Sequence, residues 1–400
     1  MEPRPVVLLR RAPLGRQARG HPCYDPRVRG DHPFDLPTAD IVDLSFWRGK
    51  RVFLTGHTGF KGSWLALWLQ RLGAEVTGFS LEPPTEPSFF DDTGTAEGMQ
   101  SLKGDIRDLE EISRAMRDAR PEIVFHLAAQ SLVHRGYRRP VETYSINVLG
   151  TAHVLEAVRS CADVRALVSV TSDKCYQNRE WLWGYREGEP LGGRDPYSSS
   201  KACAELVTAA YRDSFLARGE GDREPVWTAT ARSGNVIGGG DWAADRLVPD
   251  LIRGIASGQP TRSRCPQATR PWQHVLEPLG GYLVLAERLA TEGAAFASAW
   301  NFGPAPEDAQ PVGWIADRIV ELWGEGAAWK LDEETHLPEA TYLRLDCSKA
   351  ERLLGWRPKL PLEEALDWTV SWYRERQRRG DLRALSERQM AAYEELICSP

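Results

Sequence analysis

The chain has 400 residues, of which 42% are hydrophobic and 26% are charged. These values are typical of a globular protein with a substantial core. A net charge of -6 at pH 7 provides no broad basic surface, so we expect no nucleic-acid partner. No apolar run reaches the roughly 18 residues of a membrane span. The seven cysteines show no Cys-x-x-Cys spacing, which indicates reduced thiols in a cytoplasm, without a metal site or a disulfide framework.

The first 44 residues differ from the rest of the chain. They are rich in proline and arginine and have no sustained periodicity, so we expect residues 1–44 to be disordered or extraneous. A valine codon can start translation in bacteria, and the segment after Val42 leads directly into the first predicted strand. We therefore hypothesise that the natural start lies near Val42.

A short apolar run, Arg51-Val-Phe-Leu-Thr55, passes through three glycines into an amphipathic segment at 63–72. Gly56, Gly59 and Gly62 stand where a tight turn, a close backbone approach to a pyrophosphate and close helix packing each exclude a side chain. The free N–H groups and the dipole of the following helix favour phosphate. Such a motif also fits an ordinary glycine-rich turn, so the choice between the two interpretations depends on the rest of the chain.

Strands and helices alternate from this turn onward. We expect a strand at 75–81, helices at 110–117 and 142–159, and buried strands at 122–130 and 166–171. This alternation indicates an α/β fold with a doubly wound parallel sheet, whose ligands lie at the carboxyl ends of the strands. The end of the second strand has no Arg or Lys for a 2′-phosphate, which favours NAD over NADP. Glu82 is a candidate partner of the ribose.

Two segments carry the catalytic candidates. Thr171-Ser-Asp-Lys-Cys-Tyr176 follows a buried strand, and Tyr197 and Lys201 share one face of a predicted helix. A phenol with a pKa near 10 is a poor base at neutral pH, but a neighbouring ammonium and a cationic nicotinamide favour the phenolate. Such a tyrosine can take a proton from a sugar hydroxyl. A Tyr/Lys pair by itself is more often a solvated helix face, and the glycine turn favours the catalytic interpretation.

At these motifs the chain resembles the extended short-chain dehydrogenase/reductase superfamily and, within it, the CDP-glucose 4,6-dehydratase family. The resemblance covers about residues 45–400 and rests on five segments: Gly56-His-Thr-Gly-Phe-Lys-Gly-Ser-Trp-Leu65, Thr171-Ser-Asp-Lys-Cys-Tyr176, Asp195-Pro-Tyr-Ser-Ser-Ser-Lys-Ala-Cys-Ala-Glu205, Gly234-Asn-Val-Ile-Gly-Gly-Gly-Asp-Trp242 and Arg270-Pro-Trp-Gln-His-Val-Leu-Glu277.

The resemblance implies an NAD-binding Rossmann domain at 45–237, with a returning strand near 298–303. It implies a smaller substrate-binding lobe over most of 238–400, where we expect a helix at 251–257, an extended stretch at 270–276 and a closing helix at 362–373. The implied reaction converts CDP-glucose to CDP-4-keto-6-deoxyglucose and water. C4 is oxidised, water is eliminated across C5 and C6, and hydride returns to C6 from NADH.

The resemblance also implies roles for the motif residues. Tyr197 is the base for the C4 hydroxyl, Lys201 tunes it and holds the nicotinamide ribose, and Ser172 binds the sugar oxygen at C4. Asp173 protonates the departing C6 hydroxyl. Related dTDP-glucose dehydratases have a glutamate after this aspartate as the base for the C5 proton, whereas this chain has Lys174. We hypothesise that Lys174 is the C5 base; the alternative is that it only neutralises Asp173.

Further residues complete the predicted sites. A diphosphate needs bidentate donors, so Arg246 and Arg270 are the first substrate-binding candidates, with Asn235 and Arg344 as further ones. An isolated arginine is as often part of the solvated surface. The cofactor contacts that the resemblance implies are Gly56, His57, Gly59, Phe60, Lys61, Gly62, Asp105, Ile106, Ala128, Ala129, Tyr197 and Lys201.

The superfamily implies a homodimer or a dimer of dimers, formed through helices near 142–159 and 197–215. The family implies a 3,6-dideoxyhexose pathway, as in O-antigen synthesis. Two alternatives stay open. A sugar-nucleotide 4-epimerase shares the Tyr/Lys pair but does not need Asp173 and Lys174. A non-catalytic NAD-sensing Rossmann protein would have no reason to keep Ser172, Tyr197 and Lys201 in one register.

Overall fold

The structure is a computed structural model, and it describes residues 43–219, 223–324, 326–332 and 342–398. The hypothesis of a start near Val42 and most of the predicted extension at 1–44 lie outside the described residues. The last two residues of that extension are ordered. Asp43 caps a 3₁₀ helix, η1 (Leu44–Trp47), because its side chain accepts from the Ser45 N–H at 2.9 Å.

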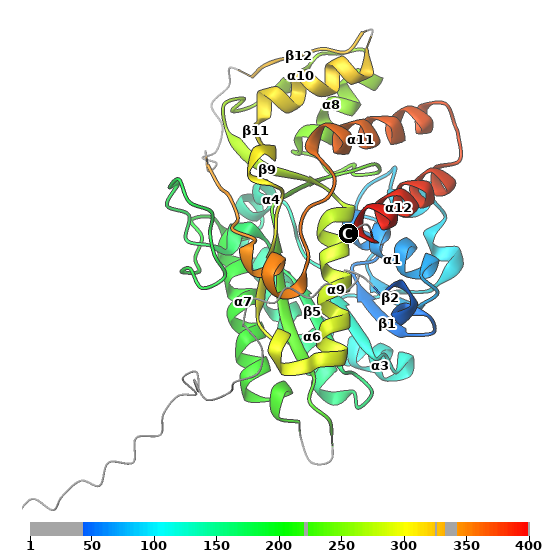
Figure 1. Cartoon of the computed structure of the whole chain (residues 1–400), viewed down its shortest axis with the longest axis vertical. Helices are drawn as coiled ribbons and strands as arrows, with labels where there is room; N and C mark the ends of the chain where they lie inside the picture. Colours follow the sequence, from blue (N-terminus) through cyan, green and yellow to red (C-terminus); the bar gives the residue numbers. More distant parts are fainter. Residues whose placement is uncertain (1–42, 220–222, 325, 333–341, 399–400) are drawn as a thin grey trace, which may run out of the picture. The chain divides into compact units, whose positions relative to one another are not determined.

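Within the described residues, seven parallel strands form the main sheet, in the order β10-β6-β5-β4-β1-β2-β3 (Figure 1). The chain steps outward from β1 to one side and then to the other, so the predicted doubly wound α/β fold is confirmed. The strands are β1 (Arg51–Thr55), β2 (Glu75–Ser80), β3 (Gln100–Lys103), β4 (Ile123–His126), β5 (Ala166–Val170), β6 (Trp227–Ser233) and β10 (Ala299–Phe302).

Helices cover both faces of this sheet. One face carries α3 (Leu109–Ala119), α6 (Thr151–Ser160) and α7 (Pro196–Ser214), and the other carries α1 (Phe60–Arg71) and α9 (Leu276–Glu292). Successive residues of a strand point alternately into the cores on the two faces of the sheet. In β1, Phe53 belongs to the core beneath α3 and α6, whereas Val52 and Leu54 belong to the core beneath α1 and α9. The strands therefore have to be apolar on both faces.

The helix predicted at 142–159 is interrupted. A short helix, α5 (Pro140–Tyr144), leads into a π-helical turn (Ser145–Gly150), and α6 follows. In the wider turn the buried Asn147 side chain accepts from the Gln130 N–H at 2.8 Å and donates to the Gln130 carbonyl at 2.9 Å. The amide thus ties the helix to the loop after β4. Hydrophobic periodicity predicts the helix direction but not such a side-chain bond.

A smaller group of elements lies at the top of Figure 1. One small sheet consists of β7 (Asn235–Ile237), β9 (Thr269–His274) and β11 (Ala309–Pro311), and β8 (Thr261–Ser263) pairs with β12 (Trp329–Leu331). The helices beside them are α8 (Leu247–Ala256), α10 (Val312–Trp323) and α11 (Leu362–Gln377). The predicted helices at 251–257 and 362–373 thus begin earlier or end later than expected.

Parts of the second half of the chain belong to the main sheet. β10 pairs with β6, α9 packs on β5 and β6, and α12 (Leu382–Cys398) packs on α1. Trp68 of α1 donates to Glu394 of α12 at 2.8 Å, and the buried Glu277 of α9 accepts from the Tyr393 hydroxyl at 2.9 Å. The two halves are therefore interleaved, and the domain boundary at 237 stays a prediction.

Candidate active site

A tight glycine turn joins β1 to α1. Gly56 has a φ of +78°, and a Cβ there would lie 2.7 Å from the backbone nitrogen of Ala128. A Cβ on Gly62 would lie 2.0 Å from the Gly56 carbonyl oxygen. The first turn of α1 thus sits directly on the strand end. α1 begins at Phe60, and Gly59 before it has no side chain that could cap the helix. The first N–H groups of α1 therefore have no capping side chain as a partner and can bind a phosphate.

His57 lies underneath this turn. Its ring is fully buried, and its Nε2 is 2.7 Å from the Ser101 hydroxyl at the start of β3. Burial lowers the pKa of His57 to about 4, so the ring is neutral at physiological pH. A Cβ on Gly78 of β2 would lie 2.4 Å from the ring. His57 therefore supports the turn from the side of β2 and β3, and its predicted cofactor contact stays a prediction.

Four further predicted cofactor residues, Asp105, Ile106, Ala128 and Ala129, follow the carboxyl ends of β3 and β4. Asp105 pairs with Arg107 at 2.5 Å beside a pocket of about 630 Å³, and Ile106 is buried next to Gly150. The run predicted as a strand at 122–130 ends as β4 at His126. The chain then leaves the sheet, and the Ala128 N–H donates to Thr55 Oγ1 at 3.2 Å. Ala129, the next residue, is half-buried.

Tyr197 and Lys201 lie one turn apart near the start of α7, and both are buried. Burial raises the pKa of Tyr197 to about 12, against the effect of its hydrogen bond with Ser172. Burial also lowers the pKa of Lys201 to about 8, against the effect of the Glu205 charge. Lys201 Nζ donates to the Val170 carbonyl at 3.4 Å. The helix thus aims both groups at the end of β5.

The turn after β5 carries Ser172, Asp173 and Lys174. Ser172 Oγ donates to Asp173 Oδ1 at 3.0 Å and accepts from the Lys174 N–H at 3.2 Å. The Asp173 side chain is buried, and its charge acts on Tyr197. Lys174 is half-buried, and its ammonium makes no hydrogen bond or ion pair within the described part of the chain. The turn therefore holds a hydroxyl and a carboxyl group that both act on the phenol, followed directly by the Lys174 side chain.

Two further cations reach this place. Lys61 leaves the first turn of α1 and donates to Ser233 Oγ at the end of β6, at 2.6 Å. Burial, together with the charge of Arg246, lowers the pKa of Lys61 to about 7. Arg246 precedes α8, and it donates to Asp241 at 2.8 Å and to Ser131 at 3.2 Å. Its charge also acts on Tyr197.

The other predicted substrate residues lie on the small sheet and near it. Asn235 begins β7 and is in register with Trp272 of β9, and Arg270 is buried in β9, where it donates to the Thr269 carbonyl at 3.1 Å. The Arg344 side chain donates to the Pro306 carbonyl, in the 3₁₀ turn that precedes β11. Of the four, Arg246 acts on Tyr197 through its charge.

Sequence reasoning did not single out three side chains that complete the group. Asp241 holds Arg246, Ser131 receives its second bond, and Ser233 receives Lys61 and also the Tyr282 hydroxyl at 3.0 Å. Asp241 lies inside one of the segments that carry the resemblance, and Ser131 directly follows Gln130 after the predicted buried run. Ser233 ends a buried strand, which is the one signal that was available for it.

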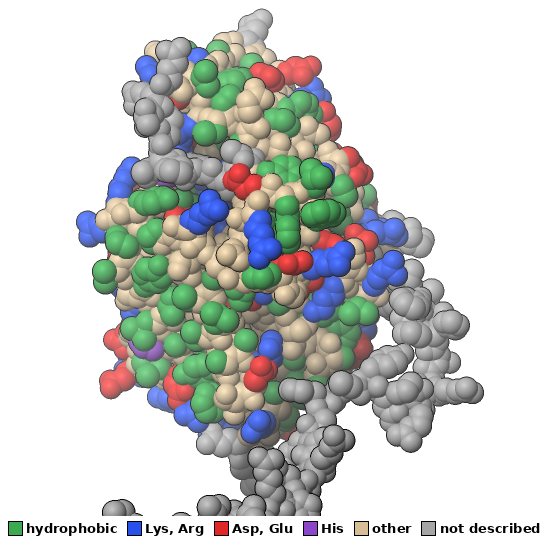
Figure 2. Space-filling view, turned by 90° about the vertical axis from the view of Figure 1, so that its left-hand side faces the viewer, with side chains coloured by type: hydrophobic (Ala, Val, Ile, Leu, Met, Phe, Trp, Pro, Cys, Tyr) green, Lys and Arg blue, Asp and Glu red, His purple; other side chains and the backbone are tan. Residues whose placement is uncertain are grey.

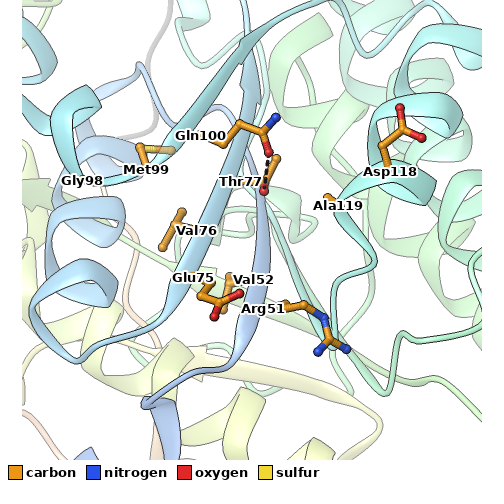
Figure 3. Close-up of a pocket in the computed structure, with 10 residues that line it drawn as sticks. All are labelled: Arg51, Val52, Glu75, Val76, Thr77, Gly98, Met99, Gln100, Asp118 and Ala119. Carbon is orange, nitrogen blue, oxygen red and sulfur yellow. Dashed lines mark hydrogen bonds between the residues drawn. The ribbon is translucent and has the colours of Figure 1, made fainter.

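Figure 3 shows a second pocket, of about 410 Å³, at the opposite edge of the sheet, where β1 and β2 begin. Arg51, Glu75 and Asp118 line it, and Thr77 donates to Gln100 there at 3.4 Å. Ligands of doubly wound sheets bind at the carboxyl ends of the strands, so this pocket is not the candidate site.

No group of three or more His, Cys, Asp or Glu side chains in the described residues is arranged to hold a metal ion. No helix in the same part of the chain has both the length and the apolar character that crossing a membrane requires.

Comparisons with known proteins identify the class. The model of the GDP-mannose 4,6 dehydratase family matches residues 53–287, and the chain belongs to this family of sugar-nucleotide dehydratases. A curated relative, the CDP-glucose 4,6-dehydratase of Salmonella typhimurium, is 54% identical over 353 residues, which are 88% of this chain and 98% of the relative. The human dTDP-D-glucose 4,6-dehydratase is 26% identical over 344 residues, covering 82% of this chain and 90% of that protein.

Solved structures agree on the fold. An epimerase from Methanothermobacter thermautotrophicus matches with a TM-score of 0.73 and 24% identity, covering 87% of this chain and 98% of that one. The dTDP-glucose 4,6-dehydratase of Bacillus anthracis, solved in complex with NAD, matches with a TM-score of 0.67 and 19% identity, covering 83% and 99%. At these identities the likeness concerns the fold.

The glycine turn leads to a first prediction. Gly62→Ala should weaken NAD binding at least about tenfold, because a Cβ 2.0 Å from the Gly56 oxygen forces α1 away from the strand end. The measurement is a calorimetric titration with NAD. Gly188→Ala is the matched control, since a Cβ there meets nothing within 4 Å. Unchanged affinity in a normally folded Gly62→Ala protein would contradict the prediction.

Proposed function

We propose that this chain converts CDP-glucose to CDP-4-keto-6-deoxyglucose and water with NAD as its cofactor. The observation that carries the proposal is the convergence of Ser172, Asp173 and Tyr197 with the half-buried basic side chains of Lys61 and Arg246 at the carboxyl edge of the sheet. The choice of CDP-glucose is supported by the relative that is 54% identical and that the chain covers almost completely.

The glycine turn fits the cofactor. Gly56 and Gly62 leave the strand end and the helix in direct contact, and the N-terminus of α1 offers backbone N–H groups to a pyrophosphate. Asp105 lines a pocket after the end of β3, where the adenosine half would bind, and Ile106 is the next residue of the chain. Bound NAD+ supplies the oxidant for C4 and, once reduced, the hydride that returns to C6.

Tyr197 starts the proposed reaction by taking the proton of the C4 hydroxyl, which Ser172 holds. In the buried site the neutral phenol is favoured, since burial raises the pKa of Tyr197 to about 12. Positive charges nearby, from Lys201 and Arg246, act toward the phenolate. Lys201 also stands where a nicotinamide ribose would meet the end of β5.

Asp173 and Lys174 then act on the 4-keto sugar. The ketone acidifies the C5 proton, the Lys174 amine takes it, and Asp173 gives a proton to the C6 hydroxyl, which leaves as water. When hydride returns to C6, the protonated Lys174 gives a proton back to C5, which completes the 4-keto-6-deoxy sugar. Asp173 already accepts a hydrogen bond from Ser172, and the Lys174 side chain is not engaged by other described groups. Arg246 would bind the diphosphate, with Arg270, Asn235 and Arg344 as further substrate contacts.

A sugar-nucleotide 4-epimerase is the second candidate. The Tyr197/Lys201 pair on one face of α7 favours it, because a 4-epimerase uses the same pair to oxidise C4. An epimerase needs the C4 oxidation but neither an acid for C6 nor a base for C5, so Asp173 and Lys174 would have no task. A protein that only senses NAD and catalyses no reaction would have no use for Ser172, Asp173 and Tyr197 at this place.

A panel of nucleotide sugars tests the proposed function. The purified protein is incubated with NAD and, in separate reactions, with CDP-, dTDP-, GDP- and UDP-glucose, and near-ultraviolet absorbance is recorded in alkali, where 4-keto-6-deoxy sugars absorb. We expect a signal with CDP-glucose only. A signal with another nucleotide would overturn the specificity. Absence of any signal would overturn the dehydratase, and inversion at C4 would then indicate the epimerase.

The role of Lys174 has its own test. Lys174→Ala should reduce deuterium incorporation at C5 from heavy water by at least about 100-fold, because no amine remains to take the proton. Mass spectrometry of the product measures it. Lys330→Ala, which removes an exposed lysine of β12, should behave like the wild type. Wild-type incorporation in Lys174→Ala would leave only the neutralisation of Asp173 as its role.

We also propose a homodimer. Four apolar side chains are exposed on or next to α5, the π-helical turn and α7: Val141 (81%), Leu149 (50%), Leu206 (58%) and Phe215 (48%). α5 and α7 pack against each other, and Figure 2, which views the side where α7 lies in Figure 1, shows hydrophobic side chains in several groups on that face. An exposed apolar surface of this kind favours a second copy as its partner.

The dimer proposal is tested by light scattering. Leu206→Glu should convert a wild-type dimer into monomers, because a carboxylate would be buried in the interface. Leu331→Glu, on an equally exposed leucine of β12, should leave the dimer intact. A monomeric wild-type protein, or a Leu206→Glu dimer, would refute this interface.

We further assign the protein to the cytoplasm, because the cysteines that the structure describes form no disulfide with one another. The keto-deoxysugar product suits the synthesis of deoxysugars, including those of O-antigens.

A further inference from the structure

A buried ion pair links α7 to β6 next to the candidate site. Glu205 of α7 and Arg232 of β6 are joined at 2.7 Å, and each side chain is only 3% exposed. Thr230 donates to the same Glu205 oxygen at 2.7 Å. Removing two charges from water is costly, and apolar residues of similar size would serve packing as well or better. A pair of this kind therefore needs a reason beyond stability.

The pair holds both ends of one short turn. Thr171, which precedes Ser172, donates to Glu205 Oε1. At the other end, Arg232 donates to the Tyr176 hydroxyl at 2.8 Å, and its guanidinium lies 4.8 Å from the centre of that ring. Tyr176 in turn donates to Asn301 of β10 at 2.7 Å. The residues between these two anchors are Ser172, Asp173, Lys174 and Cys175, so the ion pair fixes the segment that carries the proposed chemistry.

Glu205 also continues the catalytic face of α7. Tyr197, Lys201 and Glu205 are spaced by four residues, which puts them on one side of the helix. The Glu205 charge favours the ammonium form of Lys201, against the effect of burial. The other ionisable groups that act with Lys201 are Cys175 of the turn, Lys61 of α1 and His126 of β4. Of these, Lys61 is partly protonated at neutral pH, since its pKa is lowered to about 7, and burial keeps His126 neutral because it lowers the pKa of His126 to about 3.

We propose that Glu205 and Arg232 form a positioning clamp for the dehydration, in which both residues hold the turn at 172–175 and the Glu205 carboxylate is the counter-charge of Lys201. This inference rests on the proposed function. It gives Glu205 two tasks and Arg232 one. The two residues should therefore fail in different ways when each is replaced.

The test compares Glu205→Gln with Arg232→Met by steady-state kinetics with CDP-glucose between pH 5 and pH 10. Both variants should lose kcat by about 10- to 100-fold with KM changed by less than about threefold, because the turn is displaced while substrate binding persists. In Glu205→Gln the basic limb of the kcat profile should also move down by about one pH unit, since Lys201 loses its proton more easily. In Arg232→Met, which keeps the carboxylate, that limb should not move down.

Each single variant leaves a buried charge without its partner, so folding is checked by circular dichroism and NAD binding. If either fails to fold, Glu205→Gln with Arg232→Met removes both charges and should restore the fold. The double variant should still have a low kcat. A folded variant that binds NAD and keeps wild-type kcat and wild-type pH limbs would overturn the clamp. A wild-type protein without dehydratase activity would instead overturn the proposed function.

Discussion

Burial of ionisable groups at the carboxyl edge of the main sheet is the constraint on which the candidate site depends. Desolvation raises the pKa of Tyr197 to about 12 and lowers the pKa of Lys201 to about 8. Both shifts oppose the phenolate and ammonium that proton abstraction requires. Because water has little access to these groups, compensating charges have to come from the protein and its ligands. The Arg246 charge acts to lower the pKa of Tyr197, and the Glu205 charge acts to raise the pKa of Lys201.

The same constraint explains why lysine is kept here. The chain has 42 arginines and eight lysines, yet Lys61, Lys174 and Lys201 all lie at the candidate site. A guanidinium stays charged under all physiological conditions, whereas an amine can release its proton when it is buried among other cations. Lys61 illustrates this, since burial and the Arg246 charge lower its pKa to about 7. A site with several lysines can thus adjust its charge as ligands bind.

The interleaved fold brings these charges together. The ends of β1, β4, β5 and β6 meet at one edge because all strands of the main sheet are parallel. The smaller group of elements adds Arg246, which reaches back to Ser131 after β4. α9 and α12 return to the main sheet and are tied together through Glu277 and Tyr393. The main sheet and the smaller group of elements therefore both contribute side chains to the site.

Local signals in the sequence determined the doubly wound sheet, the glycine turn and the shared face of Tyr197 and Lys201, because hydrophobic period, glycine spacing and helical spacing act over short distances. Only the tertiary structure decided that His57 lies beneath the turn, that Lys61 reaches Ser233, and that Arg246 acts on Tyr197 through its charge. The π-helical turn and the pair of Glu205 with Arg232 were equally hidden. These features depend on partners up to 172 positions apart and on how much water their packing excludes, which no local pattern encodes.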